Sequence, residues 1–133
     1  MTEGGEGLKI GDLDDGGVYV GPSAEDGKPL HATLADEPEH LTLDEAFAAA
    51  DRLKSVHPTA HVPTPNELNA NLYENRGKGA LKGTFNIKGS FLNIAYRSSL
   101  SFEDRTALTQ WFDDGHQNIA GRADYRLPVR LVW

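Results

Sequence analysis

The clearest pattern in the chain is the helical spacing of apolar residues in "LTLDEAFAAADRLKSV", residues 41–56. Apolar side chains recur there at intervals of three and four, which places them on one face of a helix. Thr42 and Glu45 have the spacing of a capping box, in which each side chain bonds the backbone N–H of the other residue. We therefore predict an amphipathic helix between Thr42 and Pro58, with a buried face formed by Leu43, Ala46, Phe47, Ala50 and Leu53.

A second capping box, in "PTPNEL" at residues 63–68, predicts another helix. Thr64 is the expected N-cap, Pro65 occupies the first helical position, and Glu67 reaches back to the cap. Leu68 and Leu72, with Tyr73 beside them, form the expected buried side, and a glycine at 77 or 79 ends the helix. A helix this short is stable only when it is docked, so the cap should fix where it begins against a sheet.

Turn signals and β-prone runs predict antiparallel strands around these helices. Asp-Gly pairs at 15–16 and 26–27 are typical of hairpin turns, because both residues tolerate positive φ. We expect strands near Leu8–Ile10, Gly17–Gly21 and Leu30–Thr33, and another in "IAYRSSLS", residues 94–101. The final run, "YRLPVRLVW", alternates as a strand would, with Val129, Leu131 and Trp133 on one face.

Two segments have a less regular pattern. Residues 77–93, "GKGALKGTFNIKGSFLN", contain four glycines and isolated apolar residues, which predicts a long, partly anchored loop of the kind that often carries function. Residues 101–112 leave two alternatives open. Leu108, Trp111 and Phe112 have helical spacing, but the Asp-Asp-Gly sequence at 113–115 indicates a hairpin turn and therefore a strand.

Length and composition predict one globular domain, residues 8–133, preceded by a flexible tail at residues 1–7. The chain has no cysteine, which excludes disulfides, thiolate metal sites and a cysteine nucleophile. Its N-terminus lacks the basic and apolar regions of a secretion signal, and no apolar run is long enough for a membrane span. We expect a soluble protein without a membrane partner, either cytoplasmic or exported by a route without a cleavable signal peptide.

Charge is distributed unevenly along the chain, whose net charge is −7. Residues 1–75 hold 15 acidic and 4 basic residues, whereas residues 76–133 hold 5 acidic and 9 basic ones. This pattern indicates either an anion-binding face or two halves that pack together and neutralise each other, and we favour the second interpretation. No acidic residue lies between 76 and 102, where cations alternate with aromatic residues. The resulting candidates for ligand binding are Arg76, Lys78, Lys82, Lys88, Tyr96, Arg97 and Arg122.

Motifs for metals and catalysis are weak. His57 and His61 have a zinc-binding spacing on a helix, but Pro58 between them disfavours a helix there. The acidic pair at 113–114 and His116 are explained more simply by a turn. Ser98 and Ser99 lack a nucleophile-elbow motif, and "GKGALKGT" lacks the Lys-Ser or Lys-Thr ending of a phosphate loop. We therefore predict a protein without enzymatic activity, metal or cofactor.

Several short blocks occur together in an order that resembles the Lcl C-terminal domain family, a bacterial family of mostly unknown function. The matching residues are Pro63, Thr64, Glu67 and Leu68, then Tyr96, Ser98 and Ser99, then Phe112 and Gly115, and finally Val129 and Arg130. Two family aromatics are replaced: Ala60 and His61 stand where the family has Trp-Arg, and Arg97 stands where it has a second Trp. A cysteine found in some members is also missing, so the chain resembles a divergent member.

The resemblance implies an α+β, C-type lectin-like fold in which two short helices flank a small antiparallel sheet with a long loop region. It would place residues 77–93 in that loop region and make residues 106–112 a strand. The function it implies is a binding module that recognises a protein or glycan partner through residues 77–99 and the loops at 113–126. The alternative is an anion or nucleic-acid binder that uses residues 76–99, although the net charge argues against nucleic acid.

Overall fold

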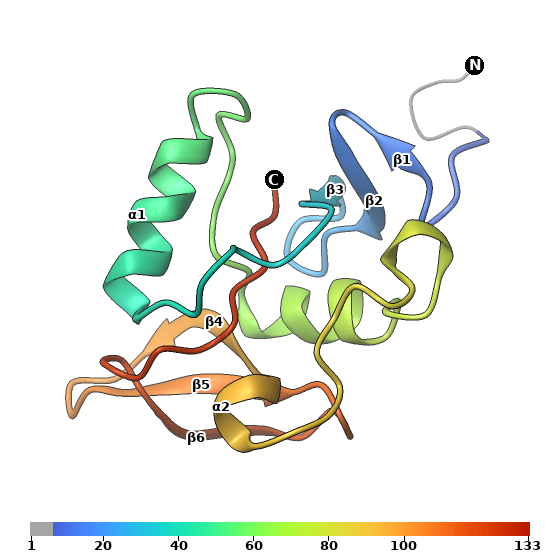
Figure 1. Cartoon of the computed structure of the whole chain (residues 1–133). Coiled ribbons are helices and arrows are strands. Elements are labelled where there is room, and N and C mark those ends of the chain that lie inside the picture. The colour runs from blue at the N-terminus through green and yellow to red at the C-terminus, as the bar shows by residue number, and fades with distance from the viewer. Residues whose placement is uncertain (1–6) are drawn as a thin grey trace.

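The computed structural model describes residues 7–133 and has an α+β architecture with two three-stranded antiparallel sheets. Figure 1 shows one sheet above and the other below a central helical segment that follows residue 64. The expected tail, residues 1–7, lies outside the described residues except for Gly7. In chain order the elements are β1 (Leu13–Asp14), β2 (Gly17–Pro22), β3 (Pro29–Ala32), α1 (Leu43–Leu53), the π-helix η1 (Glu67–Tyr73), the 3-10 helix η2 (Gly79–Leu81), α2 (Phe91–Ile94), β4 (Ala95–Ser101), β5 (Thr106–Trp111) and β6 (Gln117–Arg122).

The first sheet has the order β1-β2-β3, and both predicted Asp-Gly turns connect its strands. Asp15 and Gly16 have φ values of 53° and 80°, which a tight hairpin turn requires. The predicted strand at Leu8–Ile10 is wrong. The backbone bends there, because Asp12 N–H bonds the Lys9 carbonyl and Gly11 has a φ of 101°. The first strand therefore begins only at Leu13.

The second sheet has the order β4-β5-β6. The strand predicted over residues 94–101 is confirmed as β4, and residues 106–111 form strand β5 rather than a helix. A hairpin turn follows β5 and pairs it with β6. In this turn Gly115, with a φ of 85°, donates its N–H to the Trp111 carbonyl at 2.8 Å. Strand β6 had no expected counterpart in the sequence.

Helix α1 begins with the predicted capping box. Thr42 accepts from Glu45 N–H at 3.2 Å, and Glu45 accepts from Thr42 N–H at 2.9 Å. Leu43, Ala46 and Ala50 are buried as expected, but Phe47 is 40% exposed, so the buried face is narrower than the spacing predicted. The helix therefore packs mainly through small alanine side chains.

The second capping box is also present, but the helix it starts is not a regular α-helix. Thr64 N–H donates to the Glu67 carboxylate at 3.1 Å and Glu67 N–H donates to Thr64 Oγ1 at 3.1 Å, and Leu68 and Leu72 are fully buried. From Glu67 to Tyr73 the segment is a π-helix. Asn71 within it donates to the carbonyls of Val20 and Pro22 at 2.8 and 2.9 Å, which docks η1 on strand β2.

The main hydrophobic core lies between the two sheets and includes side chains of η1 and of the following loop. The loop predicted at residues 77–93 is mostly irregular, but it contains the short helices η2 and the start of α2. Two of its apolar residues, Leu81 and Phe85, join the core and anchor the loop. A smaller cluster packs α1 against Val62, Val129 and Leu131. No helix in the described part of the chain is long and apolar enough to span a membrane.

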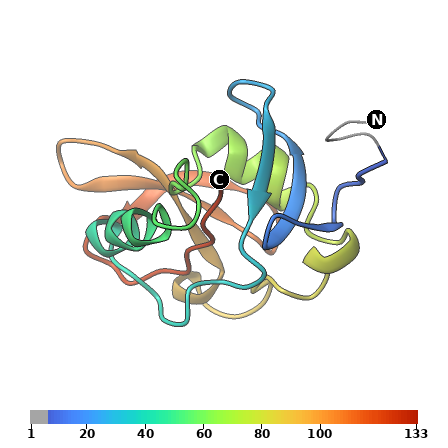
Figure 2. The ribbon, with the colours of Figure 1, turned by 90° about the horizontal axis from the view of Figure 1, so that it is seen from above.

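The run at 125–133 does not form the regular strand that its alternation predicted. Residues 127–133 are extended and all buried, and they lie in the middle of the molecule (Figure 2). On one side they bond the backbone of residues 31–41, and on the other side that of Arg97 and His61. Both edges of the segment are therefore bonded, and Pro128 and Arg130 are as buried as the apolar residues beside them.

Arg130 sits at the centre of this segment and is 0% exposed. Its Nε donates to Asp36 Oδ1 at 2.9 Å, its Nη2 donates to the Thr84 carbonyl at 2.6 Å, and its Cζ lies 4.0 Å from the centre of the Phe85 ring. Tyr96 also donates its hydroxyl to Asp36. Burial raises the pKa of Asp36, and the nearby Arg130 and Tyr96 offset only part of that effect. The network ties four distant segments together.

We expect Asp36→Asn to lower the free energy of unfolding by about 3–5 kcal/mol, because it leaves the Arg130 charge buried without a counter-charge. Urea unfolding followed by circular dichroism measures the change. Asp51→Asn is a matched control, since Asp51 pairs with Lys54 in solvent, and should change stability by less than about 0.5 kcal/mol. A loss below about 1 kcal/mol for Asp36→Asn would contradict the central role of this ion pair.

Candidate functional site

Three of the predicted cations converge on one pocket of about 660 Å³, which we call the basic pocket. Arg76, Lys78 and Lys82 all line it, so three cations from one short irregular segment face the same space. A single carboxylate, that of Glu74, is among its lining residues. The complete lining is Glu74, Arg76, Gly77, Lys78, Lys82, Gly83, Phe85 and Ile87.

Arg76 is held in place just after η1. Its Cζ lies 3.8 Å from the centre of the Tyr73 ring, in a cation–π contact, and its Nη1 donates to the Tyr73 carbonyl at 2.7 Å. The guanidinium is half-buried and keeps N–H groups that this carbonyl does not use. One side of the pocket therefore carries a cation with a defined orientation.

The two lysines flank η2, which is fixed against the N-terminal part of the chain. Ala80 N–H bonds the Gly11 carbonyl at 2.8 Å, and Gly79 has a φ of 51°. A Cβ atom at Gly79 would lie 2.5 Å from the Gly11 carbonyl oxygen, so only glycine permits this approach. The backbone between Lys78 and Lys82 is thereby anchored, while both side chains remain exposed.

The floor of the basic pocket is apolar. Phe85 is 8% exposed, and its ring packs against Arg130, Phe112 and Tyr96. Ile87 is 49% exposed beside it. Cations around an apolar floor suit a ligand that combines an anionic group with an apolar one. The cations bind the anionic group, and the apolar floor buries the apolar group.

Tyr96 and Arg97 do not belong to this surface, which corrects the expectation that they form one binding surface with the exposed cations of the loop. Both are 0% exposed. Tyr96 is in the core, where its hydroxyl donates to Asp36 and accepts from Asn86 N–H. Arg97 donates to backbone carbonyls, and burial lowers its pKa to about 10. The alternation of cations and aromatics predicted a binding surface, but the two residues of this pattern in β4 are buried side chains.

Lys88 and Arg122 are also separate from the basic pocket. Lys88 is exposed further along the loop, and it is not among the pocket's lining residues. Arg122 lies at the end of β6, where its Nε is 3.3 Å from Asp124 Oδ1. The structure thus divides the seven sequence candidates into three that converge, two that are buried and two that lie elsewhere.

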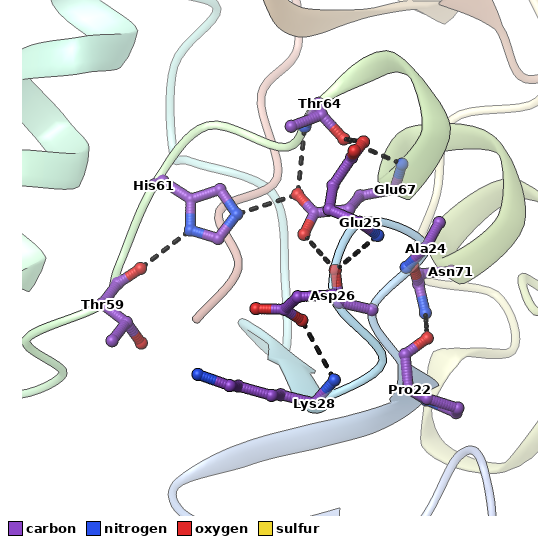
Figure 3. A network of polar contacts seen from close by, with 11 residues as sticks. Pro22, Ala24, Glu25, Asp26, Lys28, Thr59, His61, Thr64, Glu67 and Asn71 are labelled. Atoms are coloured by element: carbon purple, nitrogen blue, oxygen red, sulfur yellow. Dashed lines mark hydrogen bonds and ion pairs between the residues drawn. The ribbon is translucent and has the colours of Figure 1, made fainter.

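A second pocket, of about 260 Å³, lies beside the start of η1 and contains a buried carboxylate. Glu67 is 3% exposed and accepts hydrogen bonds from Ser23 Oγ at 2.7 Å, from Thr64 N–H at 3.1 Å and from His61 Nε2 at 2.8 Å (Figure 3). The sequence predicted only the capping role of Glu67. No local signal links it to Ser23, which is 44 residues away.

The hydrogen bonds of His61 determine what this group can do. Its Nδ1 lies 2.8 Å from the Thr59 carbonyl, which can only accept, and its Nε2 lies 2.8 Å from the Glu67 carboxylate. Both ring nitrogens therefore act as donors to acceptor oxygens in an imidazolium–carboxylate pair. Glu67 raises the pKa of His61. Burial by itself would raise the pKa of Glu67, but hydrogen bonds from His61, Ser23 and Thr64 outweigh it and lower that pKa.

The remaining histidine and acidic candidates are not gathered around a common centre. Within residues 7–133, no group of three or more His, Cys, Asp or Glu side chains could hold a metal ion. His57 stacks on Trp133 with ring centres 3.8 Å apart, and it does not share the hydrogen bonds of His61. Asp114 accepts from His116 N–H at 2.9 Å, which is a turn contact.

Comparison of the sequence with protein-family models finds no matching family, and comparison with curated proteins finds no match either. The resemblance to the Lcl C-terminal domain family stays a prediction. What the protein binds must therefore be inferred from the two pockets.

The His61–Glu67 pair should make stability depend on pH. The raised pKa of His61 gives stabilisation that is complete below its ordinary value of 6.5 and is lost as pH rises through the folded value. The lowered pKa of Glu67 gives stabilisation that is present above its ordinary value of 4.5 and is lost in more acidic solution. The pair should therefore stabilise the fold most between these two ordinary values.

Urea unfolding at about pH 6 and about pH 9 tests this expectation. The wild type should lose more stability between these conditions than His61→Gln, which carries no charge at either pH. His116→Gln is the control, because His116 is exposed and lacks a carboxylate partner among the described ion pairs. If His61→Gln keeps the full wild-type dependence on pH, another group is responsible.

Proposed function

We propose that the protein is a non-enzymatic binding module that holds an acidic, partly apolar segment of a partner protein in the basic pocket. The observation that carries this proposal is the convergence of Arg76, Lys78 and Lys82 around the apolar floor made by Phe85 and Ile87. A carboxylate next to an apolar side chain would complement both parts of the pocket. The affinity would come from charge-assisted hydrogen bonds together with burial of the apolar group.

The form of the floor favours a peptide over a glycan or a nucleic acid. Sequence-tolerant binding of bases uses the open faces of aromatic rings as stacking platforms. Phe85 is almost fully buried, and Arg130 lies over its ring, so it offers little open face. Ile87 is the more exposed apolar contact, and an aliphatic side chain suits an apolar peptide side chain better than a planar base. A free anion or nucleic acid in the same pocket is the alternative.

The hydrogen-bonding pattern supports a role without catalysis. The lining residues of the basic pocket include no serine, cysteine or histidine that could act as a nucleophile or as a neutral base. In the second pocket, both nitrogens of His61 donate, so neither can accept a proton, and the Ser23 hydroxyl donates to the Glu67 carboxylate, which also accepts from His61 and from Thr64 N–H. These groups are therefore committed to holding the start of η1.

We also propose that the chain is a divergent member of the Lcl C-terminal domain family with a C-type lectin-like fold. The ordered blocks at residues 63–68, 96–99, 112–115 and 129–130 support this proposal. The presence of two main helical segments, antiparallel strands and an irregular loop region is compatible with it. In such a fold the basic pocket would belong to the long loop region that carries binding.

Titration of the isotope-labelled protein with a peptide of alternating Glu and Phe tests the binding proposal by two-dimensional amide NMR. Saturable shifts should be confined to residues 74–87. Lys82→Glu should weaken binding by about tenfold or more, since a charge-assisted contact is replaced by repulsion. Lys88→Glu is the matched control, because it makes the same charge change in the same loop outside the basic pocket.

Equal weakening by Lys82→Glu and Lys88→Glu would mean that the overall charge of the loop attracts the peptide, and the pocket proposal would fail. Parallel titrations with a heparin-derived oligosaccharide and a short single-stranded DNA separate the other ligand classes. Stronger binding of DNA, with a steep loss of affinity as salt increases, would favour the alternative. No response to any of the three probes would overturn the proposal of an anion-binding pocket.

A further inference from the structure

Three buried polar atoms in the second sheet have no hydrogen-bond partner. They are Arg97 Nη1, Thr109 Oγ1 and Trp111 Nε1. Among the described residues, these are the buried side-chain nitrogen and oxygen atoms without a hydrogen-bond partner. Arg97 and Thr109 are 0% exposed as whole residues. Buried polar groups in folded proteins are nearly always paired, so three on neighbouring residues call for an explanation.

The three residues are neighbours on one face of the sheet. Arg97 in β4 lies directly opposite Thr109 in β5, and Ala95 lies opposite Trp111 in the same unbroken register. Residues two apart in a strand point to the same side, so Thr109 and Trp111 share the face of Arg97. Arg97 and Thr109 are directly opposite, a relation that places Cβ atoms about 4.5–5.5 Å apart, and Trp111 is diagonal to Arg97, at about 7–8 Å. Long and aromatic side chains bridge the diagonal spacing, so a common small ligand could contact all three.

The remaining donors of Arg97 are all used by backbone carbonyls. Nε donates to Leu41 at 3.0 Å, and Nη2 donates to Arg122 at 2.7 Å and also to Ala123 and Tyr125. Nη1 lies on the opposite side of the planar group from the Nε hydrogen, and neither of its two N–H groups has a partner among the described residues.

The positive charge of Arg97 is not neutralised by a direct ion pair. Among the described residues no carboxylate makes a salt bridge with it. Asp124 is the one acid whose charge influences its pKa, but Asp124 is exposed and its Oδ1 is paired with Arg122. Burying a cation without a counter-charge carries a large desolvation free energy, and the dipoles of carbonyl groups offset only part of it.

Aromatic residues cover this part of the sheet. Phe91 of α2 contacts the Trp111 ring edge-on, with centres 6.0 Å apart, and it contacts Tyr125 at 6.4 Å. Figure 1 shows α2 lying across the sheet beside β5. The cover restricts water, so any charge–charge attraction beneath it is screened less than at the surface.

We propose that Arg97, Thr109 and Trp111 bind a small monovalent anion of the halide class inside the protein. The unpartnered atoms offer four hydrogens, two on Arg97 and one each on Thr109 and Trp111. A water molecule accepts two hydrogen bonds and would have to donate its own hydrogens, for which these groups offer only the Thr109 oxygen. A halide accepts from all of them and neutralises Arg97. A phosphate would bring more charge and more bulk than one cation and one pair of strand positions can take up.

This anion site is separate from the basic pocket. None of its three residues lines that pocket, and its cover comes from α2 and residues 122–125 rather than from η2. A halide here would act as an internal counter-ion that fixes β4, β5 and the segment after β6. The proposal therefore does not depend on the proposed binding function.

The indole N–H resonances of the two tryptophans test the proposal in the intact protein. At constant ionic strength, sodium gluconate is replaced stepwise by sodium chloride, with assignment by Trp111→Phe. We expect the Trp111 indole resonance to shift, or a second resonance to appear, with a saturable dependence on chloride. The Trp133 indole is an internal control that should not respond, because it donates to Asp15 at 3.0 Å.

Thr109→Val has nearly the same shape and removes one donor, so it should weaken the apparent chloride affinity by about tenfold. Ser99→Ala, at a neighbouring, partly exposed position of β4, should leave it unchanged. A Trp111 resonance that is the same in chloride and gluconate would overturn the proposal and indicate internal water instead. An unchanged affinity in Thr109→Val would overturn it as well. The wild-type titration decides the question even if the valine variant does not fold.

Discussion

The buried ion pair between Arg130 and Asp36 is the interaction on which both the core and the basic pocket depend. The Arg130 guanidinium joins the extended segment at 127–133 to the loop around Thr84, and Asp36 also accepts a hydrogen bond from the Tyr96 hydroxyl. Arg130 also supports the Phe85 ring, which is the floor of the basic pocket. Such a pair is tolerated in the interior only when every partner is in place. The geometry of the loop that lines the basic pocket is therefore set by the same contacts that close the core.

The uneven charge of the sequence has two explanations, and each applies to different residues. Some cations of the second half neutralise acids of the first half, as Arg130 does with Asp36 and Arg126 does with Glu45. Others, namely Arg76, Lys78 and Lys82, stay together around the basic pocket. Arg97 follows neither course, because backbone carbonyls rather than a carboxylate surround its charge.

Local signals in the sequence predicted local structure well. The capping boxes at Thr42 and Thr64 placed both helix starts, and the Asp-Gly pairs placed two hairpin turns, because these features depend on residues close together in the chain. The docking of η1 depends instead on Asn71 reaching β2, and the partition into two sheets depends on contacts across the whole chain. Pattern analysis has no access to such contacts.

The same distinction applies to the candidate site. Arg76, Lys78 and Lys82 were identified from a run without acidic residues in which cations alternate with aromatics, whereas the Gly11–Gly79 contact that holds this part of the loop has no local signature. Tyr96 and Arg97 were expected at a binding surface because basic residues interleaved with aromatics are typical of surfaces that bind polyanions. Their burial depends on distant contacts, since Tyr96 packs with Phe85 and Phe112 in the core and the Pro128 carbonyl of the extended segment accepts the Arg97 N–H.

That extended segment also has a consequence for how the protein reaches its native state. Residues 127–133 bond the backbone near residues 31, 41 and 61, which precede them by more than half of the chain's length. Closing such long loops costs chain entropy before any contact rewards it, and proteins dominated by distant pairings fold slowly. The hairpins can form early from neighbouring residues, whereas the backbone bonds of this segment form only once residues 31–41 and 61 are brought to it. Its Pro128 carbonyl also accepts the Arg97 N–H, so the arrival of the segment protects the outer edge of β4 next to the bond from Ser99 N–H to the Pro63 carbonyl.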